Sequence, residues 1–212
     1  MSKVAVIVET REHDAFPFVI NNVMSILPDD WSLQVFHGTS NYDYVYDSVE
    51  NDMTLLWKEV EFTNLGIDSI LCPNSEHKVE DFEHFDYIGG YWGNQLDMLD
   101  NDYSKVMNGG LSIRKKSFML DIIKNELQPY LERGGNPCED YFVTDRIRTK
   151  PKVRDVLNFS IDNGYMYPLN DKAPFGLHKP WGANPAKGHG KYYNEIKKVC
   201  KDVEKLEIYN GV

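Results

Sequence analysis

Continuous apolar runs alternate with amphipathic segments from the beginning of this chain. Residues 3–9 contain a run of β-branched residues, which is typical of a strand buried on both faces. Residues 15–27 carry apolar side chains at helical spacing, with Asp14 placed to cap a helix and Pro28 to end it. Residues 33–37 are again apolar and predict a second strand. The chain therefore begins with a predicted strand–helix–strand unit.

The same alternation continues to the end of the chain. Short apolar runs predict strands over residues 67–71, 87–90 and 111–114. Amphipathic spacing predicts helices over residues 41–50, 79–85, 116–127, 139–148, 152–159 and 192–205. Residues 55–60 fit a helix and a strand equally well. This order favours an α/β fold, with a mixed, mostly parallel sheet flanked by helices. We expect one domain over residues 1–212, or the N-terminal part of a longer protein.

The amino-acid composition limits the cellular locations that we expect for the protein. The 212 residues are 42% hydrophobic and 26% charged, an ordinary globular mixture. No apolar run approaches the ~20 residues of a membrane-spanning helix, and the apolar start is too short for a signal peptide. Cys72, Cys138 and Cys200 are odd in number and match no zinc or disulfide spacing. We therefore expect a cytoplasmic protein without a membrane span.

The net charge of −10 limits the kinds of binding partner that we expect for the protein. Nucleic-acid-binding surfaces usually cluster basic residues, so we expect no nucleic-acid partner. A phosphate-bearing ligand would need a local cation: a metal ion, a lysine or a helix N-terminus.

Two groups of polar residues lie near the ends of predicted strands. Glu9, Thr10 and Arg11 follow the first strand, where ligands of parallel sheets bind, although a charged loop with a local ion pair explains them equally simply. Asp68 lies in an apolar segment, where a carboxylate needs a partner. That partner is a divalent cation on one interpretation, and on the other Asp68 caps a turn.

Two further groups allow both a functional and a structural interpretation. Asn108, Gly109 and Gly110 enter a strand, which suggests a bend close to a ligand, but Asn-Gly also favours a hairpin turn. Glu139 and Asp140 open a predicted helix, where acids commonly complement the helix dipole. The same position suits a general base next to an acceptor hydroxyl.

Residues 175–181 place two chemically active side chains next to each other. His178 offers a ring nitrogen to a divalent cation, and Lys179 offers a compact charge to a phosphate. Trp181 suits either a sugar-stacking surface or the core, and the same holds for Tyr91 and Trp92. By itself the segment is most simply an aromatic-rich turn.

Taken in order, these segments resemble a known family. The segments that carry the resemblance are residues 6–13, 31–38, 68–72, 85–92, 108–114, 139–140 and 175–179. Their order is similar to that of small, poorly characterised GT-A-type glycosyltransferases of bacteria and large DNA viruses. The resemblance implies a Rossmann-like nucleotide-binding core and transfer of a sugar from a nucleotide-diphosphate donor, of the UDP-sugar type, to a glycan hydroxyl.

The resemblance also implies roles for the polar groups. Asp68 and His178 would hold Mn²⁺ or Mg²⁺, and Lys179 would contact the diphosphate. Asp140 would be the catalytic base, with Glu139 as the alternative. The remaining groups would line the ligand, with Glu9, Thr10 and Arg11 near the nucleotide base and ribose, and Asn108, Gly109 and Gly110 near the donor sugar or acceptor.

One departure from the family pattern keeps an alternative open. Gly66 and Ile70 flank Asp68 at a spacing of two, so the second acid of the Asp-x-Asp motif is missing, and Ser69 or water would have to replace it. A non-catalytic domain that binds a nucleotide-sugar or glycan is therefore the main alternative. A nucleotidyltransferase fits less well, since no glycine-rich loop follows the first strand.

Overall fold

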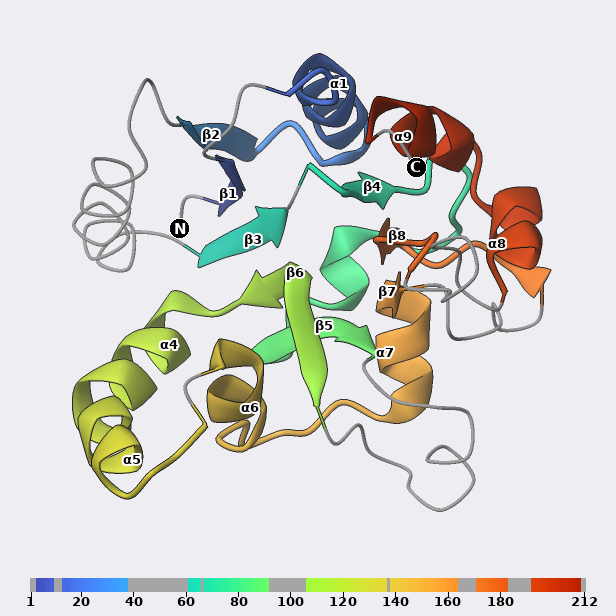
Figure 1. The fold of residues 1–212 in the computed structure, drawn as a ribbon. Coiled ribbons are helices and arrows are strands. Elements are labelled where there is room, and N and C mark those ends of the chain that lie inside the picture. Colours follow the sequence, from blue (N-terminus) through green and yellow to red (C-terminus); the bar gives the residue numbers. More distant parts are fainter. Residues whose placement is uncertain are drawn as a thin grey trace.

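The strands of this protein form one curled, mixed sheet flanked by helices (Figure 1). The computed structural model describes residues 3–9, 13–37, 61–65, 67–91, 106–136, 138–163, 171–182 and 192–210. Within these residues the sheet has eight strands in the order β2-β1-β3-β6-β5-β7-β8-β4. The α/β class expected from the sequence is confirmed.

The first part of the chain supplies three strands at one end of the sheet and β4 at the opposite end. Its elements are β1 (Lys3–Glu9), α1 (Phe16–Ile26), β2 (Trp31–His37), β3 (Glu61–Leu65) and β4 (Ser69–Leu71). The predicted strands over 3–9 and 33–37 and the helix over 15–27 are confirmed. The sequence did not predict β3, which pairs parallel with β1. The predicted elements over 41–50 and 55–60 lie outside the described residues.

The expected cap of α1 is wrong. The N-cap is Ala15 rather than Asp14, and no side chain caps the helix there. Instead, the backbone N–H of Ala15 donates to Nδ1 of His13 at 3.1 Å. A histidine two residues before the N-cap thus takes one of the hydrogen bonds that a helix start leaves open.

The second part of the chain supplies the centre of the sheet. Its strands are β5 (Tyr87–Tyr91), β6 (Met107–Arg114), β7 (Ser160–Asp162) and β8 (Gly176–His178). The expectation of a mixed sheet is confirmed, because the pairs β1–β2, β1–β3, β5–β7 and β7–β8 are parallel, whereas β3–β6, β5–β6 and β4–β8 are antiparallel. Residues 108–110 lie inside β6, whose pairing with β5 shifts register between Gly89 and Gly90, so the predicted bend is found and the hairpin turn is not.

Helices cover the sheet and match the predictions unevenly. They are η1 (Val79–Asp81), α4 (Lys116–Ile122), the π-turn η2 (Ile123–Leu127), α5 (Gln128–Glu132), α6 (Glu139–Thr144), α7 (Val153–Phe159), α8 (Tyr193–Val199) and α9 (Val203–Tyr209). The helices over 116–127 and 152–159 are confirmed. The one over 79–85 shrinks to a single 3₁₀ turn, and the one over 139–148 ends at Thr144. The helix over 192–205 is two helices, because Asp202 adopts a left-handed backbone with φ of 70°.

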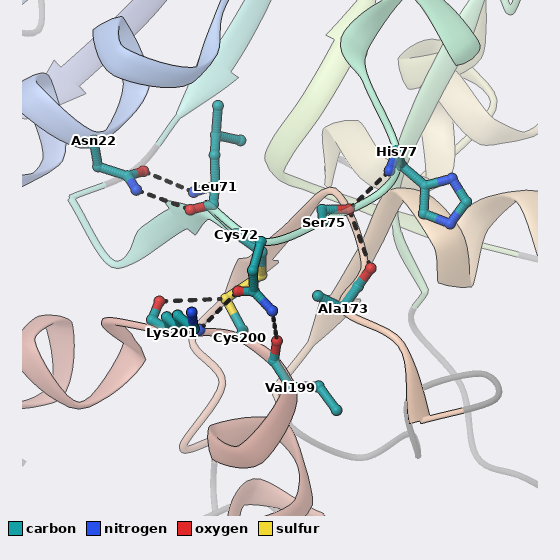
Figure 2. The surroundings of a disulfide bond; sticks show 10 residues. Asn22, Leu71, Cys72, Ser75, His77, Ala173, Val199, Cys200 and Lys201 are labelled. Carbon is teal, nitrogen blue, oxygen red and sulfur yellow. Dashed lines mark hydrogen bonds between the residues drawn. A yellow bond between two sulfur atoms is a disulfide. The ribbon is translucent and has the colours of Figure 1, made fainter.

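The C-terminal helix pair, α8 and α9, is fastened to β4 and the residues around it (Figure 2). Cys72 and Cys200 form a disulfide across 128 positions of sequence. The Asn74 side chain donates to Val199 O at 2.5 Å and accepts from Lys201 N at 3.1 Å. The absence of a disulfide spacing in the sequence was therefore misleading for these two cysteines, because residues far apart in sequence meet in the fold. The cytoplasmic location, which rested partly on it, stays a prediction.

The outer edge of β4 is closed by a side chain. Leu71 N donates to Oδ1 of Asn22, and Nδ2 of Asn22 donates back to Leu71 O, both at 2.8 Å. Asn22 lies on α1, which packs on β4. The strand that follows Asp68 is thus held by β8 on one edge and by α1 on the other.

The side chains of Tyr91 and Trp181 belong to the hydrophobic core. They are 4% and 8% exposed, which favours packing over a sugar-stacking role. Trp92 lies outside the described residues. None of the helices in the described part of the chain combines the length and apolar character needed to span a bilayer.

Candidate functional site

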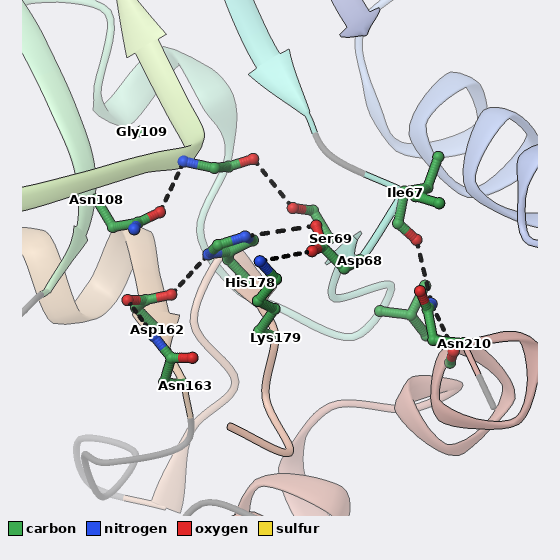
Figure 3. Close-up of polar contacts among 12 residues, drawn as sticks. Ile67, Asp68, Ser69, Asn108, Gly109, Asp162, Asn163, His178, Lys179 and Asn210 are labelled. Carbon is green, nitrogen blue, oxygen red and sulfur yellow. Dashed lines mark hydrogen bonds and ion pairs between the residues drawn. The ribbon is translucent and has the colours of Figure 1, made fainter. Parts of the chain in front are cut away.

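Asp68, His178 and Lys179 meet at the junction of β4 and β8. Antiparallel pairing puts Ser69 opposite His178, so Asp68, just before β4, lies beside Lys179, just after β8. The backbone N–H of Lys179 donates to Asp68 O at 2.9 Å. The Asp68 carboxylate reaches both side chains, with Oδ1 3.4 Å from His178 Nε2 and Oδ2 3.2 Å from Lys179 Nζ (Figure 3). The sequence-predicted group is therefore brought together by strand pairing.

Lys179 adopts an unusual backbone conformation at this junction. Its φ is 43°, in the left-handed region that residues other than glycine rarely occupy. Such strain persists where surrounding contacts fix it, and it clusters at binding sites. The Lys179 side chain is half-exposed, so its ammonium group combines an anchor on Asp68 with access from solvent.

A second carboxylate, missed by the sequence analysis, lies on the other side of the imidazole. Asp162 ends β7, which pairs parallel with β8 and puts Asp162 beside His178. Its Oδ1 lies 2.6 Å from Nδ1 of His178, and the side chain is 1% exposed. The available sequence signal was only an acid that follows Ile161, just after the predicted helix over 152–159, and β7 was not predicted.

The two carboxylates and the lysine control the ionisation of this group. Burial would lower the pKa of His178, but the hydrogen bonds to Asp162 and Asp68 outweigh it and raise the pKa to about 9. Burial would likewise raise the pKa of Asp68, but its contacts with His178 and Lys179 hold that pKa well below its ordinary value of 3.8. A positively charged imidazole between negatively charged carboxylates is the stable arrangement around neutral pH without a ligand.

Asn108, Gly109 and Gly110 form the wall beside the imidazole. Gly110 O accepts from the hydroxyl of Ser69 at 3.1 Å, and Gly110 N donates to Oδ1 of Asn108 at 2.7 Å. A Cβ on Gly110 would lie 2.3 Å from His178 Nε2, so only glycine leaves room for the ring. The Ser69 hydroxyl, a candidate to replace the missing second acid, is committed to the Gly110 carbonyl.

Asp140 and Glu139 lie beside Gly109, the residue of β6 that precedes Gly110. Gly109 N donates to Oδ1 of Asp140 at 2.7 Å. Arg114 is buried and reaches Glu139 Oε1 at 3.2 Å, Gly109 O at 3.3 Å and the Ser112 hydroxyl at 3.0 Å. Arg114 had no predicted role, although it lies in the segment 108–114 that carries part of the family resemblance.

Asp140 is the more buried acid of the pair, and its pKa is shifted. Burial raises the pKa to about 6, helped by the negative charges of Glu139 and, less, Asp162, and opposed by the Gly109 N–H and Arg114. Because Asp162 also contacts His178, the two halves of the site share one electrostatic environment across Gly109 and Gly110. A carboxylate with a pKa near 6 is suited to accept a proton around neutral pH.

The donor atoms of the first half fit a divalent cation. A carboxylate oxygen on Asp68 and an imidazole Nε2 on His178 face each other, and the second imidazole nitrogen is held by Asp162, the pattern found around metal-bound histidines. No group of three or more His, Cys, Asp and Glu side chains suited to a metal occurs among the described residues. One or two protein ligands, with phosphates and water as the others, are what Mg²⁺ commonly takes at phosphate sites.

Of the predicted group Glu9, Thr10 and Arg11, only Glu9 belongs to the described residues. Glu9 ends β1, and Thr10 and Arg11 lie outside the described residues. Their predicted contact with a nucleotide therefore stays a prediction.

Comparison with known proteins bears on the same region. Residues 64–178 match a family described as "Protein of unknown function (DUF5672)". The match covers more than half of the chain. The chain belongs to the DUF5672 family. The matched region of this DUF5672 chain begins just before Asp68 and ends at His178, so it contains every residue of the site except Lys179.

Two other comparisons add little to the family assignment. No curated protein matches the DUF5672 chain. Among solved structures it is similar to the crystal structure of A197 from STIV, at 16% identity and a TM-score of 0.40, over 71% of this chain and 81% of that one. A likeness at that TM-score carries no argument.

Proposed function

We propose that the DUF5672 chain is a glycosyltransferase of the GT-A type, which moves a sugar from a nucleotide-diphosphate donor, a UDP-sugar, to a hydroxyl group of a glycan. The observation that carries the proposal is the meeting of Asp68, His178 and Lys179 on one side of Gly110, with Asp140 beside Gly109. Donor and acceptor chemistry would thus have separate groups, which lie beside two neighbouring residues of one strand, β6.

The first half of the site suits the leaving diphosphate. Glycosyl transfer breaks the bond between the anomeric carbon and a diphosphate oxygen, and the electron pair leaves with the diphosphate. Asp68 and His178 would hold Mn²⁺ or Mg²⁺, which when bound stabilises the negative charge on that oxygen. Lys179 adds a half-exposed ammonium group that can turn from Asp68 to a phosphate oxygen. These groups supply local positive charge in a protein whose net charge is −10.

The second half of the site suits the acceptor. The acceptor oxygen forms the new bond to the anomeric carbon and gives up its proton. Asp140 takes that proton on Oδ2, since Oδ1 is held by the backbone of Gly109. Glu139, the alternative base, is paired with Arg114 and is more exposed, so we assign it to tuning the pKa of Asp140.

A non-catalytic domain that binds a nucleotide-sugar or glycan is the second candidate. It is favoured by the position two residues after Asp68, where Ile70 is fully buried in the core and no second acid of an Asp-x-Asp motif is available. The two candidates share donor binding and differ in turnover.

The test is UDP and UDP-sugar binding by calorimetry with and without Mn²⁺, followed by an assay for UDP release. Asp68→Ala and His178→Ala are expected to weaken Mn²⁺-dependent UDP binding without unfolding the chain. Asp155→Ala and His77→Ala are matched controls outside the site. Wild-type affinity in both site variants would remove the metal assignment, and donor binding without UDP release from any of several UDP-sugars would leave the binding domain ahead.

A further inference from the structure

The imidazole of His178 lies between two carboxylates, with Asp68 at Nε2 and Asp162, from β7, at Nδ1. We infer that Asp162 is a positioning residue, which holds the imidazole of His178 so that Nε2 faces Asp68 and can bind a divalent cation when it gives up its proton. The inference rests on the proposed function and adds to it a residue that neither the Asp-x-Asp pattern nor the family match assigns.

The backbone fixes where Asp162 lies. Parallel pairing of β7 and β8 aligns Asp162 with His178, so neighbouring side chains of the two strands lie on the same side of the sheet. Oδ1 of Asp162 is 2.6 Å from Nδ1 of His178, and Oδ2 accepts from Nδ2 of Asn163 at 2.7 Å. Both carboxylate oxygens are therefore engaged, and the side chain is not free to turn away.

The fixed carboxylate determines which nitrogen of His178 faces the ligand. An ionised carboxylate only accepts hydrogen bonds, so Nδ1 donates its proton to Asp162. Nε2 is then directed to Asp68, 3.4 Å away. In metal-binding proteins a partner on the second ring nitrogen fixes the orientation of the ring and typically strengthens metal binding by 10-fold to 100-fold, roughly.

Two glycines make this arrangement possible. A Cβ on Gly90 would lie 3.1 Å from Cβ of Asp162, and a Cβ on Gly110 would lie 2.3 Å from Nε2 of His178. The carboxylate and the ring are thus packed against bare backbone on two neighbouring strands, β5 and β6. Such close approach leaves the imidazole little room to rotate once Asp162 holds it.

A purely structural role for Asp162 makes a different prediction. If Asp162 only satisfied a buried histidine, its removal would lower stability but would not act on metal affinity in the folded protein. The experiment therefore measures the ring and the metal separately, on the whole chain and under conditions where each variant is folded.

The ring is measured by NMR of ¹⁵N-histidine-labelled protein without metal. The Nδ1 proton of His178, assigned by its absence in His178→Gln, is expected to give a slowly exchanging signal in the wild type and in Asp162→Asn, whose amide oxygen still accepts. It is expected to be lost in Asp162→Ala. Mn²⁺ affinity, measured by electron paramagnetic resonance with Mn²⁺ alone, is expected to fall about 10-fold to 100-fold in Asp162→Ala and less in Asp162→Asn.

Asp155→Asn is the control, because it changes a carboxylate on α7, outside the site, and is expected to leave Mn²⁺ affinity unchanged. Should Asp162→Ala fail to fold, Asp162→Asn and Gly90→Ala, which crowds Asp162, carry the test. Wild-type Mn²⁺ affinity and an unchanged Nδ1 proton in the folded variants would overturn the positioning role. A different outcome is that the wild type binds no Mn²⁺ and the Nδ1 proton signal is lost in Asp162→Ala. That result would overturn the metal part of the proposed function and keep Asp162 as the residue that orients His178.

Discussion

Gly110 lies against the imidazole of His178 so closely that a single added carbon would reach Nε2. The Cβ of an alanine there would come within 2.3 Å of Nε2 and 2.4 Å of Cε1. Gly109 has a different neighbourhood, in which a Cβ would meet the ends of Arg114 and Glu139 and, at 3.1 Å, Oδ1 of Asp140. Two adjacent glycines therefore face the two halves of the proposed site.

This arrangement predicts that alanine at Gly110 impairs binding, whereas alanine at Gly109 impairs transfer. Gly110→Ala is expected to displace His178 and to weaken Mn²⁺ and Mn²⁺-dependent UDP binding at least 10-fold, roughly, by analogy with the loss of a partner around a metal-bound histidine. Gly109→Ala is expected to retain UDP binding and to slow transfer to the acceptor, because it disturbs Asp140. Calorimetry and a transfer assay on both variants check this, and equal effects of the two alanines on UDP binding would contradict it.

The raised pKa of Asp140 predicts a pH dependence of transfer. A base works only when deprotonated, so the rate at saturating donor is expected to rise with pH and level off above about 6. Glu139→Gln removes a negative charge that raises this pKa and releases Arg114, which lowers it. The plateau of that variant is therefore expected to begin at lower pH, and an unshifted rate profile would remove Glu139 from this role.

Replacing Asp140 itself is expected to separate binding from transfer. Asp140→Asn keeps the shape of the side chain but cannot accept the acceptor's proton, so transfer is expected to fall by about 10²-fold to 10⁴-fold, the usual contribution of general base catalysis. UDP and Mn²⁺ binding are expected to stay at the wild-type level. Unchanged transfer would show that Asp140 is not the base.

The raised pKa of His178 predicts how stability changes with pH in the absence of metal. Its pKa is about 9 in the folded chain against an ordinary value of 6.5, so the stabilisation is full below about 6.5 and is lost as pH rises through about 9. The free energy of unfolding, measured with urea, should therefore decrease between these pH values. His178→Gln should show a smaller decrease over the same interval, and an equal decrease would contradict the assignment.

The Cys72–Cys200 disulfide predicts a large effect of redox state on stability. Closing a loop of 128 positions restricts the unfolded chain, and its removal by Cys72→Ser and Cys200→Ser together is expected to cost about 3–5 kcal/mol. Cys138→Ser is the matched control, because Cys138 is not part of a disulfide, and it should leave the urea midpoint nearly unchanged. A double variant as stable as the wild type would show that the helix pair needs no cross-link.

The site residues that could be predicted from the sequence are those with a local sequence signal. Asp68 and the pair His178–Lys179 were found because each is a polar residue in an apolar segment, and the structure brings them together. Asp162 was missed because its importance comes only from the pairing of β7 with β8, and β7 is three residues long. A strand that short gives too little alternation to recognise.

The same limit explains the errors in the fold. Cys72 and Cys200 show no local pattern, since their meeting depends on α8 folding back to β4. The break between α8 and α9 depends on the left-handed backbone of Asp202. It was not predicted, because the helical spacing of apolar residues continues on both sides of Asp202. Which strands of the mixed sheet run antiparallel was not predictable, because the strand pattern does not specify the direction in which β4 meets β8.

The Asn22 side chain has a consequence for how copies of the protein behave in solution. β4 is the last strand of the sheet, and its outer edge would otherwise present unpaired backbone groups to any extended peptide. At Leu71, Asn22 occupies both the donor and the acceptor and so imitates a neighbouring strand. The chain can therefore keep a very short terminal strand next to Asp68 without offering, at that residue, a template for edge-to-edge aggregation.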